Sequence, residues 1–168
     1  MEGQKLLIAK ASFYTNDGDK INEKTLRIYA NKSSINLLHS NDINLYFVDC
    51  TYRCVPAGLE SSNSLLLLIG YKIKYDLYEL CCIGFLSHES KDIYNQFYST
   101  WKNLYNFKPK LLTFDFDLAN IAAVKEVFGD ETLSIPCLFH LVNAWWRKAS
   151  KLNLWKKEYV KNYICSYF

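Results

Sequence analysis

Residues 111–129 set the strongest limit on the fold, because a short apolar run there passes directly into a helical pattern. The run ends at Asp115, and apolar residues then recur at positions 118, 121, 124 and 128, before a glycine at 129. This spacing indicates a helix, and a following glycine commonly ends one. In α/β proteins, a strand that ends beside a helix often places an acid at the ligand-binding edge of the sheet. We therefore predict a strand–helix unit in which Asp115 is the candidate for chemistry and Asp117 is the helix N-cap.

The composition indicates one folded domain. The chain has 168 residues, of which half are apolar and 16% aromatic, so disorder is not expected. The net charge of +3 permits a nucleic-acid partner without requiring one. The sequence contains no apolar run of membrane-spanning length, and its first residues lack the pattern of a signal peptide. We therefore expect no membrane association, an intracellular location and six reduced cysteines.

The rest of the chain predicts a mixed sheet. The strands of the sheet are expected over residues 43–48, 65–70, 77–86, 111–115 and 133–139, and helices from about residues 90, 117 and 141. Before them, residues 25–30 alternate well enough for a short strand, and a small helix is expected from Asn31 to His39. The short link between the second and third strands favours an antiparallel pair, and the later strands alternate with helices. This order of elements is that of the ribonuclease H-like fold. We therefore expect an α/β protein with a five-stranded mixed sheet flanked by helices.

Asp49 and Asp115 follow the first and fourth of these strands. In the ribonuclease H-like order these two strands lie side by side, so the fold would bring both carboxylates together. Mg²⁺ prefers such oxygen ligands, and two ions can clamp the attacking and leaving oxygens of a phosphodiester. The alternative is that the acids only cap helices or improve solubility. We take Asp49 and Asp115 as candidate catalytic and metal-binding residues, with Mg²⁺ or Mn²⁺ as the ion.

The central part of the chain resembles the transposase domain of Mutator-like elements. The resemblance rests on the order and spacing of residues 26–30, 47–56, 113–119, 137–141 and 144–148. It implies an enzyme that cuts and joins DNA, with a ribonuclease H-like core that holds two Asp and one Glu. On this resemblance Asp49 is the first acid, Asp115 is the second, and Cys137 and His140 form the CxxH signature of the family. It also implies a DNA partner and a nuclear location, and it leaves a homo-oligomer open.

The sequence departs from the family pattern in its acids and at one glycine. Cys50 replaces the usual glycine after the first Asp, where a side chain would either crowd the metal site or only replace a permissive turn. The third acid of the family would lie beyond Phe168, so we expect a core that is truncated on its C-terminal side. Glu158 is a secondary candidate for this acid, although its flanking lysines give it an ordinary role as a helix ion-pair partner.

These departures favour a partial transposase core without catalytic activity, and the alternative is a non-catalytic DNA-binding or regulatory remnant. The expected organisation is an N-terminal extension over residues 1–24, a transposase-like core over residues 25–150, and the start of a C-terminal helical region over residues 151–168.

The CxxH pair has two interpretations. Together with Cys50 and Cys54, Cys137 and His140 have a spacing that is acceptable for zinc. We favour the other interpretation, in which Cys137 packs within the fifth strand and His140 caps or orients groups at the strand–helix junction. Accordingly, we do not expect zinc.

A basic segment follows the CxxH pair. Arg147, Lys148 and Lys151 are interleaved with tryptophans, as in surfaces that follow phosphates and stack on bases. Tryptophans at helical spacing more often belong to a core, and in the absence of the inserted region of the family they would simply be left exposed. We take the three cations as candidate DNA-binding residues.

Overall fold

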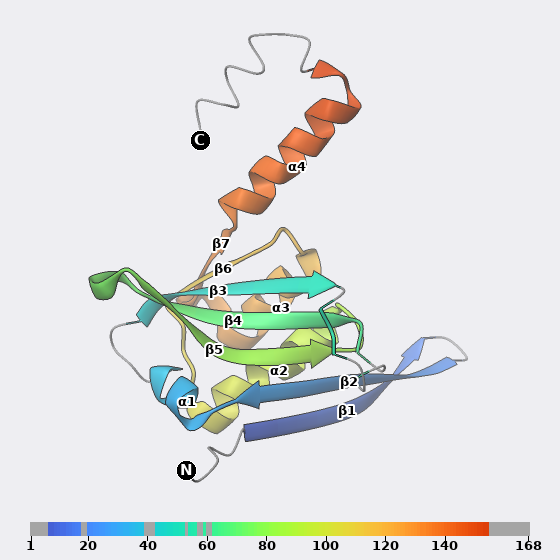
Figure 1. Cartoon of the computed structure of the whole chain (residues 1–168). Helices are drawn as coiled ribbons and strands as arrows, with labels where there is room; N and C mark the ends of the chain where they lie inside the picture. The colour runs from blue at the N-terminus through green and yellow to red at the C-terminus, as the bar shows by residue number, and fades with distance from the viewer. Residues whose placement is uncertain are drawn as a thin grey trace.

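A seven-stranded mixed sheet forms the centre of the computed structural model (Figure 1). The structure describes residues 7–17, 20–38, 43–52, 54–56, 59 and 62–154. The strands are β1 (Leu7–Asp17), β2 (Lys20–Ala30), β3 (Ile43–Tyr52), β4 (Ser64–Lys72), β5 (Leu77–Leu86), β6 (Leu111–Phe114) and β7 (Leu133–Pro136). Their order across the sheet is β1-β2-β5-β4-β3-β6-β7. The neighbouring pairs β1–β2, β2–β5, β5–β4 and β4–β3 are antiparallel, whereas β3–β6 and β6–β7 are parallel.

The prediction of an α/β protein with a mixed sheet is confirmed, but the prediction of five strands is wrong. The two additional strands, β1 and β2, pair with one another and continue the sheet beyond β5, and β2 includes the short strand predicted over residues 25–30. β2 buries Leu26, Ile28 and Ala30 in the core, one residue in two, as a half-buried strand should. The expected boundary between extension and core, at residues 24 and 25, therefore falls inside β2.

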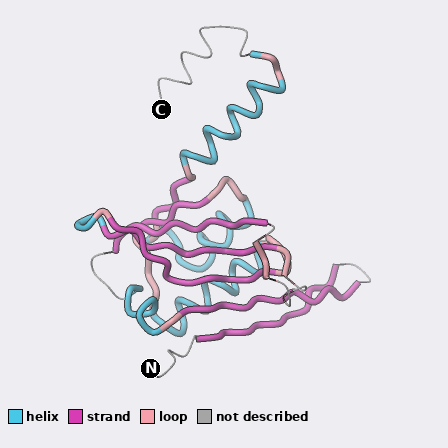
Figure 2. Tube along the Cα trace, viewed as in Figure 1, coloured by secondary structure: helices cyan, strands magenta, loops and turns pink. Residues whose placement is uncertain are grey.

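In the described part of the chain, four helices accompany the sheet: α1 (Lys32–Leu38), α2 (Lys91–Tyr105), α3 (Leu118–Phe128) and α4 (Leu138–Lys151). The described residues also form two short 3₁₀ turns, η1 (Ile73–Tyr75) and η2 (Gly129–Glu131), and Figure 2 shows the helices, strands and loops along the chain. α2 and α3 lie against one another beneath one face of the sheet (Figure 1). None of the described helices is long and apolar enough to cross a membrane.

The core lies between the sheet and helices α2 and α3. In β4, Leu66 and Leu68 are fully buried while their neighbours are only half-buried, so one face of the strand points into this core. α2 contributes Ile93, Phe97 and Trp101, as its periodicity predicts. The predicted fourth member, Leu104, is 62% exposed because it lies in the last turn of the helix, away from the sheet.

α3 begins and ends at the predicted residues, but the face that it buries differs in part from the predicted one. Asp117 is its N-cap and accepts a 2.9 Å hydrogen bond from the Ala119 N–H, and Gly129 ends it with a positive φ of 69°. Leu118 lies in the first turn and is 80% exposed, so its predicted place on the buried face is wrong. The residues that α3 buries are Asn120, Ala123, Val124 and Phe128.

Two predicted strand ends are also wrong. β3 runs through Asp49 to Tyr52, because its antiparallel pairing with β4 continues that far. The fifth predicted strand ends at Pro136 rather than near His140, because its partner β6 ends at Phe114, the residue paired with Pro136. The chain then enters α4 at once, and α4 projects away from the sheet (Figure 1).

Candidate functional site

The two predicted acids come directly after the last shared rung of adjacent strands. The parallel ladder between β3 and β6 ends with Val48 opposite Phe114, and Asp49 and Asp115 are the next residues on each strand. Neighbouring strands lie about 4.8 Å apart, so the backbones at the two acids are close. The predicted adjacency of the first and fourth strands is therefore confirmed.

Asp49 and Asp115 differ in their surroundings. The Asp49 side chain is about half exposed, and strand alternation turns it away from the core side on which Val48 is buried. The Asp115 side chain is exposed, and its Oδ1 accepts a 2.6 Å hydrogen bond from the Phe116 N–H. Both carboxylates are therefore open to solvent and to a ligand.

His140 contacts the first acid. Its Nε2 lies 3.7 Å from Asp49 Oδ1, and its Nδ1 is buried without a hydrogen-bond partner among the described residues. His140 lies in the first turn of α4, not at the end of a strand, and the short β7 carries it back to the acid. Cys137 is the N-cap residue of α4, so its predicted packing within the fifth strand is wrong. In the CxxH segment, Cys137 is therefore the N-cap and His140 is the third residue of the first helical turn.

Cys50 does not crowd the acids. It lies within extended β3, so its side chain points to the face opposite Asp49, where the Tyr94 hydroxyl donates a 3.6 Å hydrogen bond to its sulfur. Burial is the main reason that the pKa of the Cys50 thiol is raised to about 12, and the negative charges of Glu89, Asp49 and Asp117 add to the effect. A thiol that resists ionisation is a poor zinc ligand.

Glu89 is an acid that the sequence analysis missed. One carboxylate oxygen accepts a 2.5 Å hydrogen bond from the Tyr52 hydroxyl, and the other is buried with no partner among the described residues. Glu89 follows β5, which is parallel to β3, so both acids belong to the same end of the sheet. The sequence signal that could have identified Glu89 is its position after the third apolar run, which forms β5. This end of the sheet is therefore strongly acidic, with four carboxylates at Asp49, Glu89, Asp115 and Asp117.

The carboxylates of Asp49 and Asp115 suit one divalent cation but not a pair of cations. Two exposed carboxylates can bind one hard divalent ion weakly, but a pair of ions needs a further acid. In the described part of the chain, no group of three or more His, Cys, Asp or Glu side chains is arranged to hold a metal. Glu158, the secondary candidate for the third acid, lies outside the described residues.

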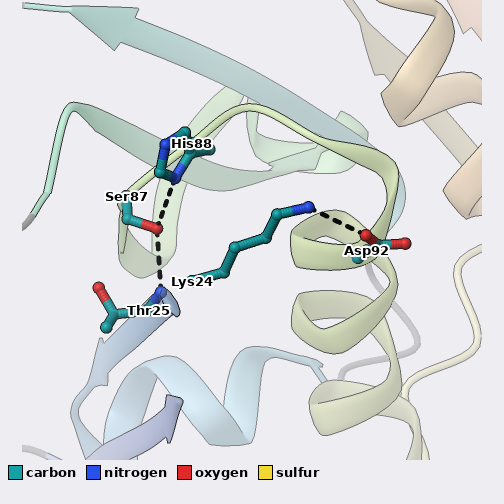
Figure 3. Close-up of polar contacts among 5 residues, drawn as sticks. All are labelled: Lys24, Thr25, Ser87, His88 and Asp92. Carbon is teal, nitrogen blue, oxygen red and sulfur yellow. Dashed lines mark hydrogen bonds and ion pairs between the residues drawn. The ribbon is translucent and has the colours of Figure 1, made fainter. Parts of the chain in front are cut away.

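A second polar cluster ties β2 to the turn between β5 and α2 (Figure 3). The Thr25 N–H donates a 2.9 Å hydrogen bond to Ser87 Oγ, and His88 Nδ1 lies 3.0 Å from the same oxygen. Lys24 Nζ forms a 3.0 Å ion pair with Asp92 in the first turn of α2. Ser87 is only 4% exposed and already accepts from the backbone, so this serine–histidine pair fastens the additional strands to the core and is not open to substrate.

The three predicted DNA-binding cations lie on α4. Arg147, Lys148 and Lys151 are exposed and lie on one side of the projecting helix. None of them forms an ion pair with another residue in the described range, and Trp145 beside them is also exposed. Of the region predicted at residues 151–168, only residues 151–154 are described.

The candidate site thus has two parts, which are an acidic sheet end with His140 against Asp49 and a basic helix that leaves from the same corner. An acidic sheet end repels phosphate unless a cation intervenes, whereas the exposed cations of α4 attract it. No family model, curated protein or solved structure matches the chain.

Proposed function

We propose that this chain is the catalytic core of a Mutator-like transposase with a ribonuclease H-like fold, whose acidic site does not support DNA cleavage. The observation that carries the proposal is the position of Asp49 and Asp115, each one residue beyond the last rung between β3 and β6. Support comes also from the order β3, β4, β5, α2, β6, α3, β7, α4, which is the order expected for that fold.

The donor set argues for loss of catalysis. When bound, a pair of Mg²⁺ or Mn²⁺ ions would stabilise the attacking and leaving oxygens of the phosphodiester. In this chain Asp49 and Asp115 would hold the ion, and His140 lies beside Asp49, with 3.7 Å between its Nε2 and Asp49 Oδ1. Glu89 and Asp117 lie at the same end of the sheet, but among the described residues no third acidic, histidine or cysteine side chain is arranged with these two to hold a metal. One weakly held ion provides only part of the charge stabilisation that cleavage needs.

A non-catalytic DNA-binding protein in the nucleus is the second candidate function. It is favoured by the exposed cations Arg147, Lys148 and Lys151 on a helix that projects from the fold. Such a protein needs no cation at Asp49 and Asp115, so a metal-binding measurement separates the two candidates.

Mn²⁺ should broaden the NMR amide signals of Cys50 and Phe116, the neighbours of the two acids, with a dissociation constant on the order of 1 mM. Either Asp49→Asn or Asp115→Asn should remove this broadening, because each removes one of two ligands while keeping the side-chain shape. Asp130→Asn, an exposed acid in η2 near the opposite end of β6, is the matched control and should leave it unchanged. The metal-site assignment would be wrong if these amide signals were not broadened in the unsubstituted protein, or if they were still broadened in both variants.

A further inference from the structure

A basic pocket lies at the other end of β6 from Asp115. It has a volume of about 240 Å³ and is formed where β6 and β7 begin and where α2 and α3 end. Its lining residues are Lys102, Lys108, Pro109, Lys110, Phe128, Glu131 and Thr132. Three lysines and one glutamate therefore line a single small hollow.

The frame of the pocket is fixed by buried groups. The Thr132 hydroxyl donates a 2.7 Å hydrogen bond to the Pro109 carbonyl, and the Leu133 N–H donates a 2.9 Å bond to the Lys110 carbonyl. Phe107, one residue before Lys108, is fully buried and packs edge-on against Phe128, with 5.9 Å between ring centroids. The backbone that carries Lys108 and Lys110 is thus held on both sides of Pro109. The side chains of Lys108 and Lys110 therefore extend from a backbone that is held in place.

The cations of the pocket retain unused hydrogen-bond donors. Lys102 donates to the Val127 carbonyl and lies 6.0 Å from the Phe128 ring centroid, which leaves two of its three N–H groups available. Within the described residues, neither Lys108 nor Lys110 forms an ion pair, and neither does Glu131. Three lysines against one glutamate leave an excess of positive charge among the lining residues, which favours a bound anion.

We propose that this pocket binds a phosphoryl group that is attached to a small hydroxylated unit, as in a sugar phosphate or a terminal nucleotide. Lysine ammonium groups bind phosphate oxygens through charge-assisted hydrogen bonds. Glu131 is an acceptor only, so it suits a hydroxyl of the attached unit and disfavours a second phosphate beside it. The volume is below that of pockets for drug-sized ligands, which limits the ligand to a unit of this size. The pocket is separate from the acids, so its test is independent of the proposed function.

The test is an NMR titration of the full chain with ribose 5-phosphate, with ribose as the matched control ligand. Ribose 5-phosphate should shift the amide signals of Lys110, Glu131 and Thr132, whereas ribose should not. The double variant Lys108→Ala with Lys110→Ala should raise the dissociation constant at least about tenfold, because two charge-assisted contacts are lost. Lys110→Arg keeps the charge and should retain most of the binding.

A second arm identifies the source of the phosphoryl group. A short oligonucleotide with a 5′-phosphate that binds more than about tenfold tighter than ribose 5-phosphate would indicate nucleic acid, and otherwise the ligand is a small molecule. Shifts that are absent, that ribose also produces, or that the double variant leaves unchanged would overturn the proposal.

Discussion

Replacing Trp101 with alanine should lower the free energy of unfolding by about 3–5 kcal/mol, the usual cost of removing a large aromatic side chain from a packed core. Trp101 is 1% exposed and lies where α2 faces the sheet. Its ring is 5.1 Å from that of Tyr105 and 6.4 Å from that of Phe97, both on the same helix. A small domain has roughly 5–15 kcal/mol of stability in total, so this one substitution removes a large part of it. Urea denaturation followed by circular dichroism measures the difference.

Trp145→Ala is the matched control, because the same atoms are removed from a side chain that is 51% exposed on α4. It should change the stability by about 1 kcal/mol or less. Equal losses in the two variants would show that Trp101 is not at the centre of the core, and the assignment of the buried face of α2 would be wrong.

Binding to double-stranded DNA should weaken about 40-fold when the salt concentration rises from 50 to 200 mM. This value follows if three cations on α4, Arg147, Lys148 and Lys151, each displace about one counterion, since the slope of log affinity against log salt is then about −2.7. Charge reversal in the double variant Arg147→Glu with Lys148→Glu should remove most of the affinity and reduce the slope to about −1. Fluorescence anisotropy with a labelled duplex gives both quantities.

The double variant Lys10→Glu with Lys125→Glu is the control, because it changes the net charge equally at exposed positions outside α4. It should affect binding only slightly. Affinity that does not depend on salt, or that falls equally in both double variants, would remove α4 as the DNA-binding surface.

The strand order from β3 to β7 could be predicted because apolar runs and link lengths are local features of the sequence. The additional strand β1 was not predicted, although apolar residues at 7, 9, 11 and 13 alternate with the exposed Lys10, Ser12 and Tyr14, because two of these apolar residues are alanines, which give a weak strand signal. Its place in the sheet depends on backbone hydrogen bonds to β2, which side-chain patterns do not encode.

The positions of Asp49 and Asp115 on adjacent strands followed from the strand order, but the contact between Asp49 and His140 did not. That contact depends on where β7 stops, which is set by the length of its partner β6. Glu89 was missed for a related reason, because its hydrogen bond with Tyr52 forms only when β3 continues past Asp49. In both cases the extent of a strand is decided by its neighbour in the sheet.

The central claim is that Asp49 and Asp115 retain the positions of catalytic acids without a complete site. The most direct measurement is a nicking and strand-transfer assay on supercoiled DNA with Mg²⁺ or Mn²⁺. We expect no product above that of a protein-free reaction, because one weakly held ion cannot stabilise both the attacking and the leaving oxygen. Clear metal-dependent product that disappears in Asp49→Asn, in Asp115→Asn and in Glu158→Ala would contradict the account and identify Glu158 as the third acid.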